Sequence, residues 1–117
     1  MDRKSAALAA LLVFAACLPA AAQSTTVAWK RCLNERDELP PTRVIRGCTA
    51  LIMNNEAPRT LRAVAYNNRG NVYFQTNDYP RAVADYDEAV KLGGANPNFV
   101  LNRCMAYLRL RNADKGW

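Results

Sequence analysis

Apolar side chains recur at helical spacing in the middle of this chain. Between Thr42 and Met53 they occupy positions i, i+1, i+4, i+7 and i+8, namely Val44, Ile45, Cys48, Leu51 and Ile52. An apolar stripe with this spacing predicts an amphipathic helix. Thr25–Glu38 has a weaker pattern of the same kind, and Leu39-Pro40-Pro41 interrupts it. The pattern therefore predicts one clear helix here, preceded by a poorly defined segment.

Three longer helical segments follow, and turn residues separate them. We expect helices at about Pro58–Thr76, Tyr79–Leu92 and Pro97–Arg111. Asn77 tolerates a left-handed backbone, and Asp78 can cap the helix that follows it. Pro80 lies in the first turn of that helix, where proline is tolerated, and Gly93-Gly94 ends the helix. Short loops between successive helices predict antiparallel neighbours in an all-helical fold.

One segment repeats after 34 residues. Asn68–Tyr73 reads again as Asn102–Tyr107, with Asn, Arg and Tyr identical and a small residue kept at Gly70 and Cys104. A period of this length is typical of architectures in which each unit buries its apolar face on the next unit.

Ala63–Asn96 resembles one tetratricopeptide repeat, a helix-turn-helix unit of 34 residues. The residues that carry the resemblance are the expected packing residues Tyr66, Gly70, Tyr73, Ala82, Tyr86 and Ala89, together with Asp78-Tyr79 after the turn. The resemblance implies an all-α fold of antiparallel helix-turn-helix repeats, a short TPR-like α-solenoid. Gly70 and Ala82 would lie where the two helices cross, because only small side chains allow close approach.

The resemblance extends to about 1.5–2 repeats. Pro97–Arg111 looks like the first helix of a second unit, and Val44–Ile52 looks like the second helix of an earlier one. Arg69 and Arg103 depart from the family pattern, which usually has Leu there. Stable arrays generally contain about three repeats. Two interpretations therefore remain open, a truncated structural fragment and a chain that associates with itself.

The N-terminus has the features of a secretory signal peptide. A basic start is followed by the apolar run Ser5–Ala16 and by the small residues Ala20–Ala22. We expect residues 1–22 to be removed, leaving a cysteine-stapled segment with a capping helix (23–57), the repeats (58–111) and a tail (112–117). The expected location is periplasmic or secreted. In the alternative, the chain is a lipoprotein anchored through Cys17.

Charge and cysteines restrict the partners. The net charge of +6 falls to about +5 without the signal peptide. No Lys/Arg-rich run is present, so nucleic acid is not an expected partner. The chain also resembles exported bacterial tetratricopeptide proteins with two cysteines around a proline-containing loop. This resemblance implies a Cys32–Cys48 disulfide, with two buried thiols as the alternative, and leaves Cys104 unpaired.

Catalysis has little support in the sequence. Histidine is absent, so the commonest general base and the Ser-His and Cys-His arrangements are excluded. We expect no catalytic residue, no metal site and no cofactor. Asp85, Asp87 and Glu88 are expected to form a solvated helix face, balanced by Arg81 and Lys91 at i,i+4 and i+3 spacings.

Binding is better supported than catalysis. One row spaced by four on each first helix would face the concave side, and its residues are Asn67, Asn71, Gln75, Leu101, Met105 and Arg109. Asparagine amides can both donate to and accept from a peptide backbone. The resemblance therefore implies an adaptor that binds a protein or peptide on this face. The alternative is that these are ordinary polar and capping residues.

Overall fold

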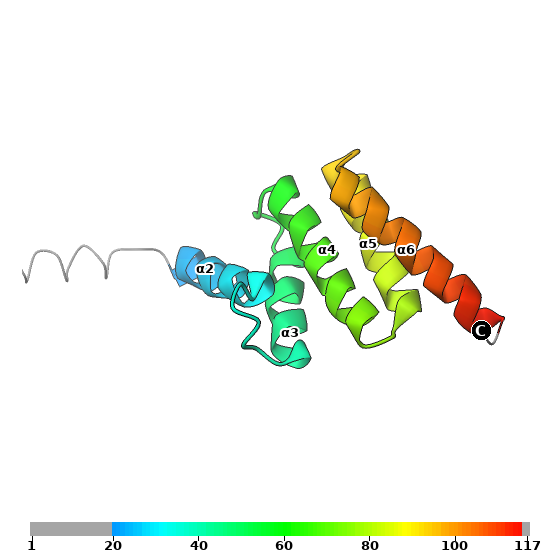
Figure 1. Cartoon of the computed structure of the whole chain (residues 1–117). Coiled ribbons are helices and arrows are strands. Elements are labelled where there is room, and N and C mark those ends of the chain that lie inside the picture. Colours follow the sequence, from blue (N-terminus) through cyan, green and yellow to red (C-terminus); the bar gives the residue numbers. More distant parts are fainter. Residues whose placement is uncertain (1–19, 116–117) are drawn as a thin grey trace, which may run out of the picture.

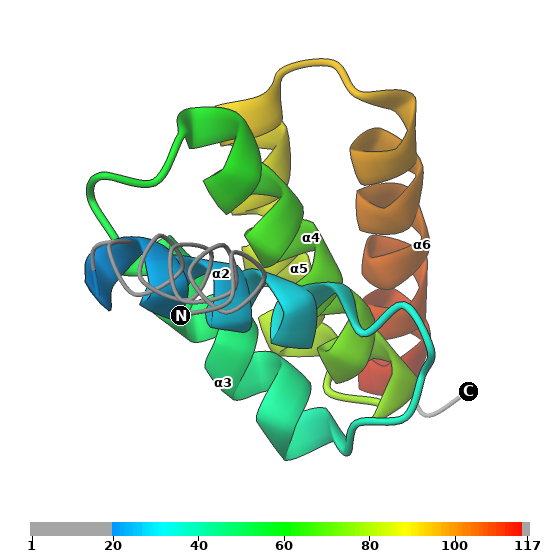
Figure 2. The same cartoon turned by 90° about the vertical axis from the view of Figure 1, so that its left-hand side faces the viewer.

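The computed structural model describes residues 20–115, and this part of the chain consists of helices and loops without strands. The helices are α2 (Ala20–Leu33), α3 (Pro41–Ile52), α4 (Arg59–Gln75), α5 (Tyr79–Gly93) and α6 (Pro97–Asp114). Each helix packs on the one before it, so the order in space follows the order in the chain (Figure 1). Figure 2 views this array from its N-terminal end, with α2 and α3 in front of the other three helices. The prediction of an all-α, TPR-like helical repeat is confirmed.

Capping residues set the boundaries of α5 and α6. Asn77 adopts a left-handed backbone with φ of 62°, which reverses the chain after α4. The side chain of Asp78 then accepts a hydrogen bond from the backbone N–H of Arg81. At the start of α6, the side chain of Asn96 accepts one from the N–H of Asn98 at 3.0 Å. These side chains satisfy N–H groups that have no partner within the helix, so both helices begin where the sequence predicts.

The core consists of clusters that each span three helices. The first joins α2, α3 and α4 and contains Ala28, Cys32, Val44, Cys48, Leu51, Ala65 and Val72. The other two join α4, α5 and α6, and their buried members are Ala82, Val83, Tyr86 and Ala106 in one and Ala63, Ala89 and Phe99 in the other. Burial of these side chains holds the three C-terminal helices together as one unit.

The N-terminal helix differs from the sequence prediction. The weak pattern over Thr25–Glu38 becomes a regular helix, α2, that begins at Ala20 and ends at Leu33. Its apolar face is narrow, but Ala28 and Cys32 are buried against α3 and α4. Packing therefore fixes a helix that the local pattern barely indicates. Most of the predicted signal peptide, residues 1–19, lies outside the described residues, and Ala20–Ala22 form the first turn of α2.

Gly70 lies where α4 approaches α5 closely. A Cβ added there would lie 2.8 Å from Cε1 of Tyr86 and 3.3 Å from Cβ of Asp85. Cys104 occupies the equivalent position in the 34-residue repeat, but it is exposed, so its presence there does not show that a larger side chain fits at Gly70. Both Gly70→Ala and Gly70→Leu should therefore strain this crossing.

We expect Gly70→Leu to lower the free energy of unfolding by about 1–3 kcal/mol, the usual cost of overpacking. Gly70→Ala should cost less, because the better helix propensity of alanine offsets part of the clash. Urea denaturation followed by circular dichroism measures both. Ala84→Leu is the control, because Ala84 is exposed on α5 and gains the same kind of side chain without a clash. Equal midpoints for Gly70→Leu and the unmodified protein would show that the two helices cross elsewhere.

Candidate functional site

A small hollow opens where α4, α5 and α6 meet. It has a volume of about 120 Å³ and is lined by Asn71, Phe74, Gln75, Tyr86, Asn102 and Met105. Each of the three helices contributes at least one of these residues, so the hollow exists only when the helices are packed together. Its lining combines amides with two aromatic rings and a methionine side chain. Such a mixture suits a ligand that has both backbone amides and apolar side chains.

Hydrogen bonds between asparagine side chains organise this hollow. Asn102 of α6 donates through Nδ2 to Oδ1 of Asn67 at 3.0 Å and to Oδ1 of Asn71 at 3.4 Å. The hydroxyl of Tyr86 donates to the same Oδ1 of Asn71 at 2.6 Å. The side-chain carbonyl oxygens of Asn67 and Asn71 thus accept hydrogen bonds inside the protein. Their side-chain nitrogens have no partner among residues 20–115, so they remain as donors.

Tyr86 stays protonated in this network. Burial of its ring, together with the nearby charge of Asp85, raises the pKa of Tyr86 to about 12. Because the phenol is neutral at ordinary pH, it can donate to Asn71 and orient that amide. The hydrogen bond from Tyr86 to Asn71 also links α5 to α4 at the hollow.

The structure separates the predicted concave row into buried and exposed members. Asn67 is buried, with 8% of its surface exposed, and Asn71 is half-buried. Gln75, Leu101, Met105 and Arg109 are exposed. Of the six predicted residues, those that line the hollow are Asn71, Gln75 and Met105. Leu101 continues an exposed apolar surface on α6 beside Met105.

The structure adds two features to this row. Asn71 is half-buried, and its carbonyl oxygen accepts hydrogen bonds from Tyr86 and Asn102 inside the protein. Asn102 and Tyr86 were not assigned to the site, although both line it. The repeat did carry a signal for Asn102, because Asn68 is its equivalent and also donates to the preceding layer, to the carbonyl oxygen of Cys32 at 3.3 Å.

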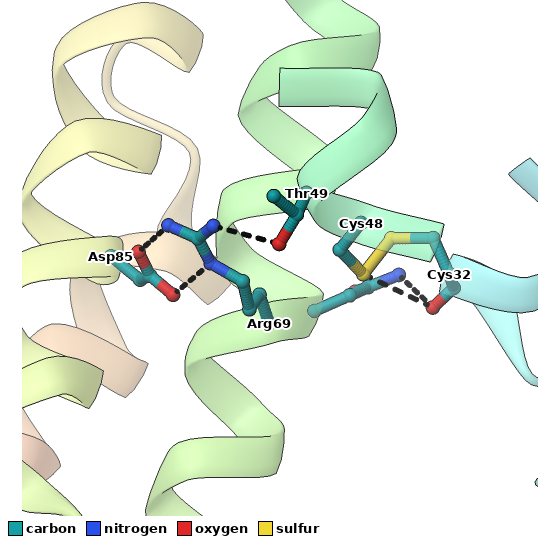
Figure 3. Close-up of a disulfide and its surroundings, with 6 residues drawn as sticks. Cys32, Cys48, Thr49, Arg69 and Asp85 are labelled. Atoms are coloured by element: carbon teal, nitrogen blue, oxygen red, sulfur yellow. Dashed lines mark hydrogen bonds and ion pairs between the residues drawn. A yellow bond between two sulfur atoms is a disulfide. The ribbon is translucent and has the colours of Figure 1, made fainter. Parts of the chain in front are cut away.

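A buried ion pair joins α4 to α5 (Figure 3). Arg69 of α4 donates to Asp85 of α5 twice, from Nε to Oδ2 at 2.8 Å and from Nη2 to Oδ1 at 2.7 Å. A third bond, from Nη1 of Arg69 to Oγ1 of Thr49 on α3, spans 3.1 Å. The hydrogen bonds to Asp85 raise the pKa of Arg69 further. One guanidinium therefore connects three successive helices.

This pair corrects the expected role of the acidic residues on α5. Asp85 was predicted to belong to a solvated face with Asp87 and Glu88, but only 4% of its surface is exposed. Arg69, which departs from the usual leucine, is the partner of this buried carboxylate. The predicted partner Arg81 instead pairs with Asp78 at 3.3 Å. Spacing along one helix could not reveal a pair formed between two helices.

A disulfide joins Cys32 of α2 to Cys48 of α3, next to Thr49 (Figure 3). Cys104 is a free, exposed thiol on α6. The disulfide, Thr49, Arg69 and Asp85 thus form a continuous series of bonds from α2 to α5. Through Asp85 and its neighbour Tyr86, this series ends at the hollow.

Other kinds of site find no support in the described part of the chain. Across residues 20–115, no group of three or more side chains that commonly bind metals comes together. In the same range, no helix has the length and apolar character needed to cross a membrane.

Comparison with known proteins identifies the central unit. Residues 63–93 match the family model of the tetratricopeptide repeat, which covers α5 and most of α4. The match supports one tetratricopeptide repeat over these residues, and such repeats generally mediate protein–protein interactions as non-enzymatic scaffolds. No curated protein and no solved structure matches the chain.

Proposed function

We propose that this chain is an exported adaptor that binds an extended protein or peptide segment in the hollow between α4 and α6. The observation that carries the proposal is the composition of that hollow. The side chain of Asn71 lines this hollow together with the exposed side chains of Gln75 and Met105, and within residues 20–115 its nitrogen is a free donor. A peptide backbone offers carbonyl oxygens for the amides, and one apolar side chain of the peptide would cover Met105.

The internal network makes this surface ready for binding. Because Asn102 and Tyr86 already hold the two asparagine carbonyl groups, the free donors point in fixed directions before a ligand arrives. A site ordered in advance loses less conformational entropy on binding. The proposal of a binding role rather than a catalytic one also agrees with the absence of histidine from the chain.

Export is the second part of the proposal. The basic start, apolar run and small residues of the first 22 positions favour a secretory signal, and an oxidising compartment would allow the Cys32–Cys48 disulfide. We place the mature protein in a bacterial periplasm or outside the cell, with lipid attachment at Cys17 as the alternative.

We expect Met105→Asp to weaken binding of a selected peptide at least about tenfold. A random-peptide phage library is first enriched on the purified, oxidised protein, and the affinity of one enriched peptide is measured by fluorescence anisotropy. The substitution places a charge where the peptide should bury an apolar side chain, which costs on the order of 1.5–3 kcal/mol of apolar burial.

Met53→Asp is the matched control. Met53 is also an exposed methionine, with 75% of its surface accessible against 45% for Met105, but it lies at the end of α3 and outside the hollow. Its substitution should leave the affinity unchanged. Equal losses in both variants, or a loss confined to Met53→Asp, would show that peptides bind another surface and would refute the proposed site.

A further inference from the structure

A second hollow lies at the C-terminal end of α2. We call it the Trp29 hollow; it has a volume of about 590 Å³ and opens between the last turn of α2 and the loop 34–40. Trp29, Leu33 and Leu39 give it an apolar floor, and all three are half-buried. Trp29 and Leu39 also pack on the core cluster of α2, α3 and α4. A hollow of this volume with an apolar floor is typical of a binding site.

Internal hydrogen bonds fix the loop that borders this hollow. Asn34 and Asp37 adopt a left-handed backbone, with φ of 45° and 52°. The side chain of Asn34 accepts a hydrogen bond from the backbone N–H of Leu39 at 3.1 Å, and its backbone carbonyl accepts one from the N–H of Asp37 at 2.8 Å. The loop also lies inside the ring that the Cys32–Cys48 disulfide closes. Leu39 is therefore held beside the hollow before any ligand arrives.

A shift of 38 residues relates α2 and α3 to α4 and α5. It aligns Cys32 with Gly70 and Cys48 with Tyr86. In both units these residues mark the place where the two helices approach closely. The cysteines form the disulfide, and a Cβ added at Gly70 would lie 2.8 Å from the ring of Tyr86. The structure therefore makes α2 the first helix of a unit like that of α4 and α5.

The same shift places the two hollows at equivalent positions. Leu33 of α2 corresponds to Asn71 of α4, and each lines the hollow of its own unit. However, α2 ends at Leu33, whereas α4 continues for another turn to Gln75. The loop 34–40 takes the place of that turn. Figure 2 shows this loop (cyan) and α6 on the same side of α3 and α5, so both hollows open on one face of the array.

The rim of the Trp29 hollow has no net charge. Two positive and two negative side chains line it, and all four are exposed: Lys30, Arg36, Glu35 and Glu38. The rim therefore favours neither an acidic nor a basic ligand group. Placing a charged group over the apolar floor would also remove water from it at a large cost. An uncharged, apolar side chain is the group that suits this hollow.

We infer that the Trp29 hollow takes an uncharged apolar side chain of the same extended segment that binds between α4 and α6. This inference rests on the proposed function, whose site it extends by one repeat. Axes of packed helices lie roughly 10 Å apart, a span of about three extended residues. The partner segment then carries two apolar residues about three positions apart, one for the Trp29 hollow and one for Met105.

The fluorescence of Trp29 tests whether the hollow is occupied. Trp117 is the other tryptophan of the chain, so Trp117→Phe leaves Trp29 as the only one. The probe is a tryptophan-free peptide enriched from a random phage library on this oxidised variant. At saturation the peptide should shift the emission of Trp29 to shorter wavelengths and reduce its quenching by acrylamide severalfold. Unchanged emission and quenching would overturn the inference.

A substitution in the floor measures what the hollow contributes to affinity. Leu33→Asn should weaken binding of the same peptide about tenfold, because it replaces apolar surface with an amide. Leu92→Asn is the matched control: Leu92 is also a half-buried leucine near the end of its helix, α5, but it lines neither hollow. Its substitution should leave the affinity unchanged. Alanine scanning of the peptide should find two sensitive apolar residues about three positions apart.

The pattern of losses separates this inference from the proposed function. A loss with Met105→Asp but not with Leu33→Asn keeps the site between α4 and α6 and overturns the role of the Trp29 hollow. A loss with Leu33→Asn but not with Met105→Asp refutes the site between α4 and α6, and with it the claim that one segment joins the two hollows. Circular dichroism establishes that both variants are folded. The fluorescence measurement changes no residue of the hollow, so it decides the inference even where Leu33→Asn fails to fold.

Discussion

Asp85→Asn is expected to lower the free energy of unfolding by about 3 kcal/mol, at the lower end of the range for breaking a buried ion pair. The substitution removes the charge that compensates Arg69 and turns one acceptor oxygen into a donor that faces the guanidinium. Because the Arg69 side chain keeps 19% of its surface exposed, water screens part of the loss. Urea denaturation followed by circular dichroism gives the value directly.

Asp87→Asn is the matched control, since the same change is made two residues further along α5. Its carboxylate is 44% exposed and its ion pair spans 3.9 Å, so the change should stay within about 0.5 kcal/mol. A third variant, Arg69→Met with Asp85→Leu, removes both charges together. Since no charge is left uncompensated, it should recover most of the stability that Asp85→Asn loses. Equal stability of Asp85→Asn and Asp87→Asn would mean that the Arg69–Asp85 pair is not formed in solution.

The sequence predicts the C-terminal helices well because their ends have local causes. Asn77, Asp78 and Asn96 cap or reverse the chain through atoms only a few residues away. Those positions therefore indicate where α5 and α6 begin. The start of α2 has no such local cause. Its first turn was assigned to the signal peptide, and contacts with α3 and α4 support the rest of the helix.

The candidate site is only partly predictable, because its key contacts cross between helices. Spacing by four correctly places Asn71 and Gln75 on one side of α4. It gives no information on the angle at which α6 crosses α4, and this angle brings Asn102 to Asn67 and Asn71. The Arg69–Asp85 pair depends in the same way on how α5 packs against α4. A departure from the family pattern at Arg69 was the one visible sign that a buried counter-charge was needed.

Removal of the disulfide is also expected to lower the free energy of unfolding strongly. Replacing both Cys32 and Cys48 with serine should lower the free energy of unfolding by about 3 kcal/mol, the value of the chain-entropy model for a loop of this length. The loss should also be local. The cluster shared by α2, α3 and α4 contains both cysteines, whereas the two clusters that hold α4 to α6 contain neither.

Two measurements separate these effects. Urea midpoints of the oxidised protein and the double serine variant give the total loss, and amide hydrogen exchange shows where it falls. Exchange should rise most in α2, because its main contacts are with α3 through the stapled pair, while α5 and α6 keep most of their protection. Cys104→Ser removes a thiol that takes no part in the disulfide, so it should change neither measurement. If the oxidised protein and the double variant unfold at the same urea concentration, the bond does not staple α2 to the array. If protection is lost equally in α6, the helices unfold as a single cooperative unit, and the stability of the peptide-binding hollow depends directly on the redox state of its compartment.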